Sequence, residues 1–489
     1  MSILATNGNG HNGNGYNGNG HNGHNGNGNG HNGDGANPGA HGRRVAIVGG
    51  GLAGITAALD CAAGGAQVTL LEARPRLGGA AYSVQRGGLT VDNGQHVFLR
   101  CCTAYRGLLE RVGAVDGVTL QRRLAIPVLA PGRAPVWLRR SGLPAPAHLA
   151  RSLLGYRLLR IGDRIAAARA LSALRAVDPD DPATDQIGFG EWLTQHGQSA
   201  EAIDRLWALI VRPTLNLVPA DASLAQAAQV FQTGLLSEAS AGDIGWARVP
   251  LSQLHDVATR RALSRAGVEV ALRTRAEAIG AGHDGGFEIE VSGRPTVHAD
   301  VVIVAVPHDR VARLIAGCAR PCSKLELLGR SPIVNLHVVY DRAVAELAFA
   351  AAVDSPVQWV FDRTAGSGLE LGQYLAVTLS AAESESTMTV DELRDRFVPA
   401  LAELFPAARA ASVELFFVTR EHAATFRAAP GARALRPGPR TEMPGLLLAG
   451  AWSDTGWPAT MEGAVRSGTA AANEALTALA RGRRRTAPM

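Results

Sequence analysis

The chain of 489 residues contains almost no lysine, although its formal net charge is +5 at pH 7. Lys324 is the only lysine, so nearly all of the 48 basic residues are arginines. Chemistry that depends on a lysine therefore has one candidate residue in the whole chain. The positive excess is mild, with a pI of about 9.2, and we expect no nucleic-acid partner.

Cysteines and long apolar runs are also scarce. The five cysteines are an odd number, which does not suit a disulfide framework. Cys318 and Cys322 are spaced C-x3-C, but no second ligand pair follows, so no metal site is predicted. No uninterrupted apolar run has transmembrane length, and residues 1–42 lack the apolar core of a signal peptide. We expect a cytoplasmic protein that is free to touch the inner face of the cytoplasmic membrane.

Residues 1–42 are a low-complexity segment of Asn, Gly and His. The segment cannot bury enough apolar area to offset the ordering of its backbone, so we predict disorder. Its histidines could bind a transition metal weakly, but a solvated tail without function is favoured.

A glycine-rich turn follows the first predicted strand. Residues 44–48 form a short apolar run, as buried parallel strands do, and Gly49–Gly54 then satisfy G-x-G-x-x-G. A second strand at 67–71 ends at Glu72, which would accept hydrogen bonds from ribose hydroxyls and repel the 2′-phosphate of NADP. In this β-α-β context the helix N-terminus is suited to a pyrophosphate. The predicted dinucleotide-binding residues are Gly49, Gly51, Leu52, Ala53, Gly54 and Glu72.

The segment from Glu72 onward has the pattern E-x-R-x-x-x-G-G. It resembles the second fingerprint of the FAD-binding amine oxidase and phytoene desaturase superfamily. The resemblance implies that paired glycines bring the backbone close to the diphosphate of FAD and that Arg74 neutralises phosphate charge. A plain NAD dehydrogenase has no reason to carry this pattern, so the predicted cofactor is noncovalent FAD. The residues concerned are Ala73, Arg74, Gly78 and Gly79.

Residues 449–468 resemble the closing motif of the same superfamily. The resemblance implies a strand, a loop under the flavin and a helix whose first N–H groups face the isoalloxazine. Ala451 departs from the family, which usually has Asp or Glu there, so one cofactor contact would be missing or supplied by Asp454. In a predicted strand at 267–272, Val270 fits the position that holds adenine through its backbone. These segments add Val270, Gly450, Thr460 and Met461 to the predicted cofactor-binding residues.

The three cofactor motifs are far apart in the chain, which predicts interleaved domains. Predicted strands that would share one sheet lie at 44–48, 67–71, 267–272, 300–306 and 445–449. The expected fold class is α/β, with a Rossmann-type FAD-binding domain interleaved with a mixed α+β substrate domain. The predicted boundaries are a tail at 1–42, an FAD-binding domain at 43–123, 246–329 and 431–480, a substrate domain at 124–245 and 330–430, and a basic tail at 481–489.

Two positions disfavour amine oxidation. Amine oxidases of the superfamily commonly carry a lysine near the flavin, in a strand that matches residues 332–340. That strand contains no lysine, and Asn335 falls at about the same position. Thr460 stands where a tyrosine of an aromatic pair would hold the amine.

The motif at residues 92–96, Asp-Asn-Gly-Gln-His, is followed by Cys101-x-x-Ala104-Tyr105. Together they resemble the squalene-associated FAD-dependent desaturases, also called the hydroxysqualene dehydroxylase family. The resemblance implies an isoprenoid lipid substrate and hydride transfer from reduced flavin to an allylic carbon of hydroxysqualene, giving squalene for hopanoid synthesis. The reaction also requires an electron donor, whose identity no motif specifies. Two alternatives stay open, a carotenoid or phytoene-type desaturase and a non-catalytic isoprenoid-binding protein.

His96 is the candidate catalytic residue, as an acid or as a group that binds the substrate hydroxyl. Asp92 and Gln95 make its surroundings polar, and an Asp–His pair would raise the pKa of the imidazole. The alternative, that His96 only orders a loop under the flavin, is equally open. Glu462 is a second, weaker candidate for the acid.

Residues 124–177 contain nine arginines and one acid, Asp163. Within them, residues 147–161 mix leucines and arginines in a way that suits an interfacial helix on anionic lipid. Arginines within residues 481–485 add charge. A helix that packs on its own domain with solvated arginines is the alternative.

Overall fold

The computed structural model describes residues 44–282, 285–318 and 323–486. The predictions for the tail at 1–42 and for Cys322 lie outside these residues. No helix within them is both long and apolar enough to cross a membrane.

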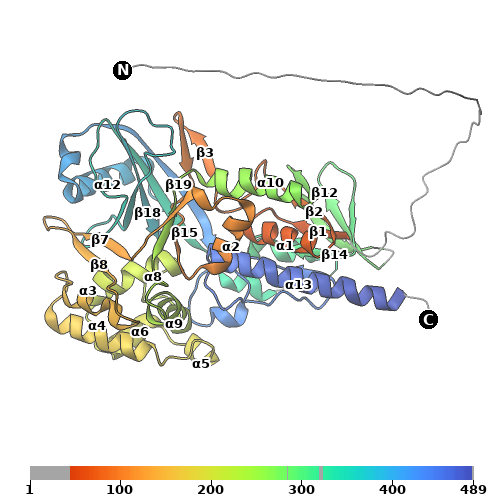
Figure 1. Ribbon diagram of the computed structural model, residues 1–489, viewed down its shortest axis with the longest axis horizontal. Coiled ribbons are helices and arrows are strands. Elements are labelled where there is room, and N and C mark those ends of the chain that lie inside the picture. Colours follow the sequence, from red (N-terminus) through yellow and green to blue (C-terminus); the bar gives the residue numbers. More distant parts are fainter. Residues whose placement is uncertain (1–43, 283–284, 319–322, 487–489) are drawn as a thin grey trace, which may run out of the picture. The chain divides into compact units, whose positions relative to one another are not determined.

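A five-stranded parallel sheet in the order β10-β2-β1-β14-β20 confirms the predicted assembly of distant strands. Figure 1 labels three of these strands, β1, β2 and β14. Val48 pairs with Leu71 on one side and Val304 on the other, so residues 256 positions apart lie in adjacent strands. These strands are apolar throughout because both faces of the sheet are covered. Their bounds are β1 (Arg44–Val48), β2 (Gln67–Glu72), β10 (Glu269–Leu272), β14 (Val301–Val304) and β20 (Leu446–Leu448).

Helices cover one face of this parallel sheet and a small antiparallel sheet covers the other. Val45, Ile47 and Ile303 pack toward the helices, whereas Ala46, Val48 and Val304 belong to the core on the opposite side. The helices are α1 (Leu52–Ala63), α2 (Thr103–Val112), α10 (Ala258–Arg265) and α13 (Met461–Thr486). The antiparallel strands are β11 (Ala276–Ala281), β12 (Phe287–Val291) and β13 (Val297–Ala299). In β12 every second residue is buried, as its alternating sequence predicts.

A seven-stranded sheet in the order β19-β15-β18-β17-β16-β7-β8 forms the second part of the fold. Val334, Leu336 and Val338 of β15 pack with α12, so Asn335 and His337 face the other side of the sheet. That other side meets β4 through an apolar cluster. The strands are β7 (Ala125–Leu129), β8 (Val136–Arg139), β15 (Ser331–Tyr340), β16 (Phe349–Ala352), β17 (Trp359–Asp362), β18 (Gln373–Ser380) and β19 (Val413–Thr425), and α12 is Val390–Leu404.

A group of helices between residues 150 and 231 completes this part. Its core is aromatic, with Phe189, Trp192, Trp207 and Phe231 in ring contact. The helices are α3 (Ala150–Leu154), α4 (Ile161–Leu174), α5 (Pro182–Asp185), α6 (Phe189–Gln195), α7 (Ala200–Ala202), α8 (Ala208–Leu215) and α9 (Leu224–Phe231). The remaining elements are β3 (Ser83–Arg86), β4 (Leu89–Asp92), β5 (Phe98–Leu99), β6 (Val118–Leu120), β9 (Ile244–Ala247) and α11 (His308–Ile315).

The prediction of one interfacial helix over residues 147–161 is wrong. A short 3-10 turn, η2 (Ala147–Leu149), leads into α3, which ends at Leu154, and α4 begins only at Ile161. Tyr156 is fully buried between them and donates its hydroxyl to the Arg205 carbonyl at 2.7 Å. Burying this side chain requires a turn, and the turn interrupts the helix.

The predicted domain boundaries stay a prediction, but the structure corrects the predicted start of the basic tail at residue 481. Helix α13 runs to Thr486, so the segment after residue 480 continues the helix and does not begin a separate tail.

Candidate FAD and substrate site

The turn after β1 is built so closely that it requires glycine. Gly49 has φ of 113°, a conformation that side chains rarely adopt. A Cβ on Gly54 would lie 1.9 Å from the Gly49 carbonyl oxygen. Helix α1 begins at Leu52 and Ala53 without a side-chain cap, so its first N–H groups are available to an anion.

Glu72, predicted to bind the ribose, also holds this turn through hydrogen bonds. Its side chain is buried, and its two oxygens accept the N–H groups of Gly50 and Arg74, each at 2.7 Å. Val270 lies on the neighbouring strand, opposite Leu70. Val270 therefore lies on the edge strand β10, in register with a residue two positions before Glu72 on β2.

The second fingerprint packs directly on the first. Gly78 donates its N–H to the Gly50 carbonyl at 2.9 Å, and a Cβ on Gly79 would lie 2.8 Å from the Gly51 Cα. Arg74 and Arg76 both donate to the Gly79 carbonyl. Ala73 in this turn is exposed. Two glycine segments at contact distance beside two guanidinium groups fit a diphosphate.

The closing motif meets α1 at its N-terminal end. A Cβ on Gly468 of α13 would lie 2.3 Å from the Ala53 carbonyl oxygen, so the two helices approach closely. Thr460 caps α13, because its hydroxyl accepts the Gly463 N–H at 3.2 Å, and Met461 opens the helix. Gly450 donates its N–H to the Ser467 hydroxyl at 2.9 Å, which fixes the loop to the same helix.

Arg436 binds the closing loop through its side chain. The sequence analysis did not predict this residue as part of the site. This buried guanidinium donates to the carbonyls of Trp452, Ser453 and Trp457 at 3.2, 2.6 and 2.6 Å. Burial lowers the pKa of Arg436 to about 10, so it stays charged at neutral pH. Asp454 accepts the Gly456 N–H and lies 3.9 Å from Arg433. That carboxylate is therefore used within the loop, and its replacement of the contact absent at Ala451 stays a prediction.

Residues 92–96 join the flavin fingerprints to the seven-stranded sheet. The Asn93 side chain donates to the Ala80 carbonyl at 2.8 Å and to Glu421 at 3.0 Å. The Asn93 carbonyl accepts the Asn335 amide at 2.8 Å. A Cβ on Gly94 would lie 3.2 Å from that amide, which is tighter than most Cβ contacts. Asn335, at the position discussed for a lysine, thus holds the motif in place.

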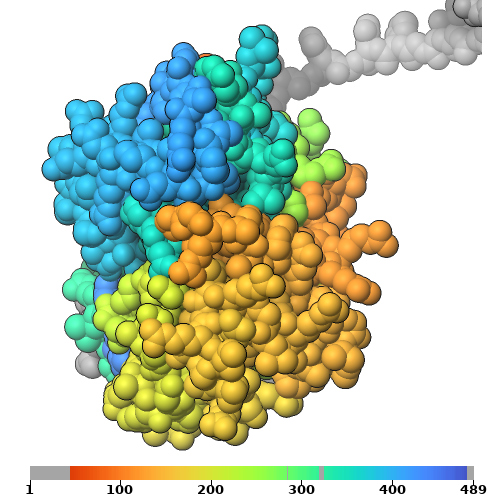
Figure 2. Space-filling model, turned by 90° about the vertical axis from the view of Figure 1, so that its left-hand side faces the viewer, coloured from red at the N-terminus to blue at the C-terminus, as the bar shows by residue number. Residues whose placement is uncertain are grey.

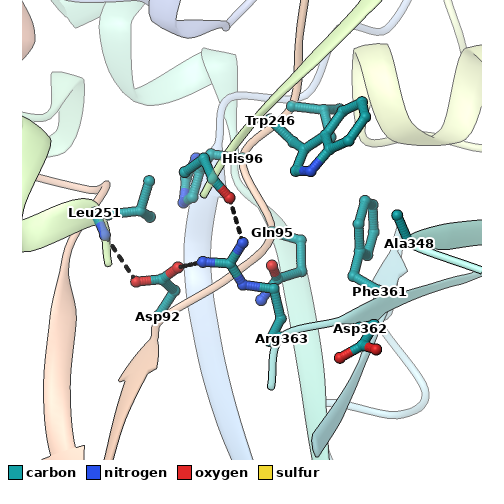
Figure 3. Close-up of a pocket in the computed structure, with 11 residues that line it drawn as sticks. Asp92, Gln95, His96, Trp246, Leu251, Ala348, Phe361, Asp362 and Arg363 are labelled. Carbon is teal, nitrogen blue, oxygen red and sulfur yellow. Dashed lines mark hydrogen bonds and ion pairs between the residues drawn. The ribbon is translucent and has the colours of Figure 1, made fainter. Parts of the chain in front are cut away.

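His96 lines a pocket together with Asp92, Trp246, Phe361 and Arg363 (Figure 3). The expected Asp–His pair is wrong, because Asp92 binds Arg363 at 2.8 Å, the Ser83 hydroxyl at 2.6 Å and the Leu251 N–H at 2.9 Å. Burial lowers the pKa of His96 to about 4, opposite to the expected direction. The imidazole is therefore neutral at pH 7.

Glu462 is a capping carboxylate for α2. Its oxygens accept the N–H groups of Ala104 and Tyr105 at 3.1 and 2.8 Å, and Arg466 binds it at 2.7 Å. These contacts tie α2 to the start of α13, and a role of Glu462 as the proton donor stays a prediction.

A buried Tyr105–His255 pair lies beside the glycine fingerprint and was not predicted as a site. The Tyr105 hydroxyl and His255 Nε2 are 2.9 Å apart, and His255 Nδ1 is 3.2 Å from the Ala81 carbonyl oxygen. Burial lowers the pKa of His255 to about 4. A Cβ on Gly78 would lie 3.0 Å from that of His255, so the pair supports the second fingerprint. Tyr105 belongs to a motif noted in the sequence, but nothing local indicated His255.

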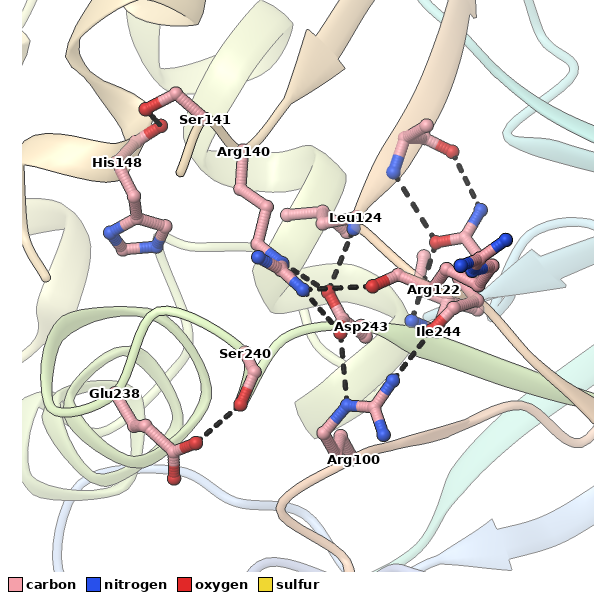
Figure 4. Close-up of polar contacts among 12 residues, drawn as sticks. Arg100, Arg122, Leu124, Arg140, Ser141, His148, Glu238, Ser240, Asp243 and Ile244 are labelled. Carbon is pink, nitrogen blue, oxygen red and sulfur yellow. Dashed lines mark hydrogen bonds and ion pairs between the residues drawn. The ribbon is translucent and has the colours of Figure 1, made fainter. Parts of the chain in front are cut away.

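Asp243 connects the strands behind the pocket (Figure 4). The fully buried carboxylate binds Arg100 at 2.9 Å and Arg140 at 2.6 Å and accepts the Leu124 N–H at 2.7 Å. The two arginines hold the pKa of Asp243 below its usual range against the effect of burial. Ile244 and Trp246 follow in β9, so this cluster fixes one wall of the pocket.

A family model described as flavin containing amine oxidoreductase matches residues 52–476. The chain belongs to this family. Hydroxysqualene dehydroxylase of Rhodopseudomonas palustris is 29% identical over 457 residues, covering 89% of this chain and 99% of that protein. A zeta-carotene desaturase of Zea mays is 25% identical, covering 87% of this chain and 82% of that protein. Cyclohexylamine oxidase from Brevibacterium oxydans has the same fold, with a TM-score of 0.67 at 19% identity over 90% of this chain and 100% of that chain.

These findings confirm the predicted fold class, the FAD cofactor and the enzyme class. The chain is an FAD-dependent oxidoreductase. No group of three or more potential metal-binding side chains occurs within residues 44–282, 285–318 and 323–486. The assignment of individual cofactor residues and of His96 stays a prediction.

Proposed function

We propose that this oxidoreductase removes the allylic hydroxyl of hydroxysqualene reductively and releases squalene. The motif at residues 92–105 supports this substrate, as does the full-length similarity to hydroxysqualene dehydroxylases. The observation that carries the proposal is the pocket itself. It combines apolar walls, Trp246, Leu251 and Phe361, with a polar side that holds the neutral imidazole of His96, Gln95, Asp362 and the Asp92–Arg363 ion pair. Apolar walls beside a polar side suit a lipid that carries a hydroxyl.

The glycine turns and the closing loop would hold FAD, which in its reduced form would supply the hydride for the allylic carbon. The hydroxyl oxygen would take up a proton from solvent and leave as water, and the proton that the reduced flavin releases on oxidation balances it. The chain's own residues provide the environment. The apolar walls exclude water from an allylic cation. Neutral His96 hydrogen-bonds to the hydroxyl and orients the C–O bond. The Asp92–Arg363 ion pair engages the Asp92 carboxylate, so Asp92 does not pair with the imidazole.

Carotenoid desaturation is a second candidate, favoured by the similarity to zeta-carotene desaturases over most of both chains. It would use the same cofactor cradle for hydride transfer in the oxidative direction. A carotene has no hydroxyl for His96 to bind, which makes this candidate the weaker one.

One anaerobic experiment tests both. Purified protein is photoreduced, then mixed with hydroxysqualene, and flavin absorbance and squalene are followed together. We expect reoxidation of the flavin with one squalene formed per flavin. The oxidised protein is mixed with zeta-carotene or phytoene in parallel. Flavin reduction with a new visible chromophore there, and no squalene in the first arm, would replace the proposal with desaturation.

A further inference from the structure

Helices α3 and α4 expose large apolar side chains to solvent. Leu154 is 66% exposed, Ile161 71% and Ile165 44%. Leu143, in the loop before η2, is 55% exposed. Single exposed aliphatic residues are common on protein surfaces, but several together mark a contact site.

These side chains come from segments that are joined to one another. Ile161 and Ile165 are one helical turn apart on α4, and the opposite face of that helix is buried through Ala167, Ala170 and Leu174. The Arg164 guanidinium donates to the Leu154 carbonyl at 2.8 Å and to the Leu159 carbonyl at 2.9 Å. These bonds hold the end of α3 against the start of α4.

The loop that carries Leu143 is also tied to this region. Ser141 donates its N–H to the His148 carbonyl at 2.8 Å, and Arg139 donates its N–H to the Ser152 hydroxyl of α3 at 2.7 Å. Figure 2 shows the face to which these segments, coloured orange to yellow, contribute the lower part. We call Leu143, Leu154, Ile161 and Ile165, with the arginines beside them, the α3–α4 surface.

The arginines beside these residues are available for an external anion. Arg151, Arg157 and Arg169 are exposed, and no carboxylate lies within 4.0 Å of them in the part of the chain that the structure describes. Asp163 is the only acid between residues 124 and 177. The apolar side chains can enter the acyl-chain region of a bilayer, and the unpaired guanidinium groups around them can bind the phosphate headgroups. The surface is therefore complementary to an anionic lipid bilayer.

Apolar contacts continue from this surface to the predicted substrate pocket. Leu149 of η2 packs against a cluster formed by Leu124, Ile244, Phe349 and Phe361. Phe361 lines the pocket that contains His96. The Arg140–Asp243 bonds anchor the base of the Leu143 loop to this wall (Figure 4). A lipid that leaves a membrane at the α3–α4 surface would therefore meet apolar side chains between that surface and the pocket.

We propose that the α3–α4 surface docks on an anionic lipid bilayer and that the enzyme collects its isoprenoid substrate there. The docking rests on exposed residues alone, whereas substrate collection rests on the proposed function. Vesicle binding measured without substrate therefore separates the two.

The full-length, FAD-loaded protein is sedimented with vesicles of phosphatidylcholine alone or of phosphatidylcholine mixed with phosphatidylglycerol. We expect binding to the mixed vesicles and little to the neutral ones. The double variant Leu154→Glu, Ile161→Glu should lose binding. Arg151→Glu with Arg157→Glu should weaken the partition about 30-fold or more, since each basic residue near the surface contributes to binding.

Leu371→Glu is the matched control, because Leu371 is 85% exposed in the loop before β18 and its neighbour Leu369 packs on the β4 side of the sheet. It should bind vesicles like the wild type. All variants should keep their flavin and turn over detergent-dispersed hydroxysqualene normally.

The proposal is overturned if the wild-type protein does not bind anionic vesicles, or if the Leu154→Glu, Ile161→Glu variant still binds them. A variant that changes only the oligomeric state in gel filtration would assign the surface to a second copy of the chain and overturn it too. If the wild type binds vesicles as expected but neither it nor any variant turns over hydroxysqualene, the result would count against the proposed function and not against the docking.

Discussion

At the scale of single residues, His96 and Asp92 illustrate how near neighbours in sequence acquire separate roles. Asp92 is the last residue of β4 and points to Arg363, which is 271 positions away in sequence. His96 follows after a turn that Asn93 and Gly94 fix to β15. The pKa of His96 is consequently set by burial and not by its neighbouring acid.

The protonation of His96 leads to a prediction about pH. With a pKa of about 4, the imidazole is neutral throughout the neutral range, so it should contribute no inflection to kcat/KM between about pH 6 and 8. His96→Gln removes the imidazole but keeps a polar side chain, and we expect kcat/KM to fall about tenfold, the worth of one hydrogen bond. Its pH profile should keep the wild-type shape.

The exposed His298 on β13 provides the control, since His298→Gln should leave kcat/KM unchanged. An inflection near neutral pH that is present in the wild type and absent from His96→Gln would contradict the neutral role and indicate an acid catalyst.

At the scale of elements, the cofactor cradle depends on the contact between two glycine segments. Gly79 has φ of 59°, and any Cβ there would meet the Gly51 backbone at 2.8 Å. Both the left-handed conformation and the steric contact oppose a side chain.

Gly79→Ala should therefore weaken FAD binding by about tenfold or more, because the strained backbone must move away from the Gly51 segment. The measurement is FAD affinity by fluorescence titration of the apoprotein, with flavin absorbance of the purified protein as a second readout. Gly107→Ala is a suitable control, since Gly107 lies in α2 with nothing within 4 Å of an added Cβ. Unchanged FAD affinity in Gly79→Ala would show that the diphosphate does not bind at this contact.

At the scale of the whole molecule, several histidines are buried in neutral form. Burial lowers the pKa of His96 and His255 to about 4 and that of His337 to about 3. His337 lies between the Tyr374 hydroxyl at 2.6 Å and the Thr419 hydroxyl at 3.0 Å, and it stacks on Phe417. Each of these side chains would gain a proton near pH 6.5 in the unfolded chain.

Between about pH 6.5 and 4 the unfolded chain therefore binds more protons than the folded one, and the free energy of unfolding falls as the pH falls. A buried histidine shifted to about pH 4 contributes a loss of about 3 kcal/mol over this interval. Denaturant unfolding at a series of pH values measures the slope. His337→Gln should make the dependence shallower, whereas a free energy of unfolding that stays constant down to pH 4 would contradict the neutral histidines.

The sequence by itself determined the elements whose signal is local. The parallel strands could be predicted because burial on both faces demands a continuous apolar run, and the glycine turn because only glycine fits where backbones touch. These two features predicted the fold class and a dinucleotide site, and the resemblance of the second fingerprint to a known superfamily predicted FAD. The same reasoning failed for residues 147–161, where composition suited a helix but the burial of Tyr156 required a turn.

Only the tertiary structure decided which charges and hydrogen-bonding groups meet. Arg363 meets Asp92, Asn335 meets Asn93, and Arg436 meets the closing loop, across separations of 271, 242 and 16 to 21 residues. No periodicity encodes such pairs, because each depends on how separate segments of the chain are placed against one another. The pKa of His96 and the exposure of Leu154 and Ile161 follow from that placement, since burial is a property of the packed chain.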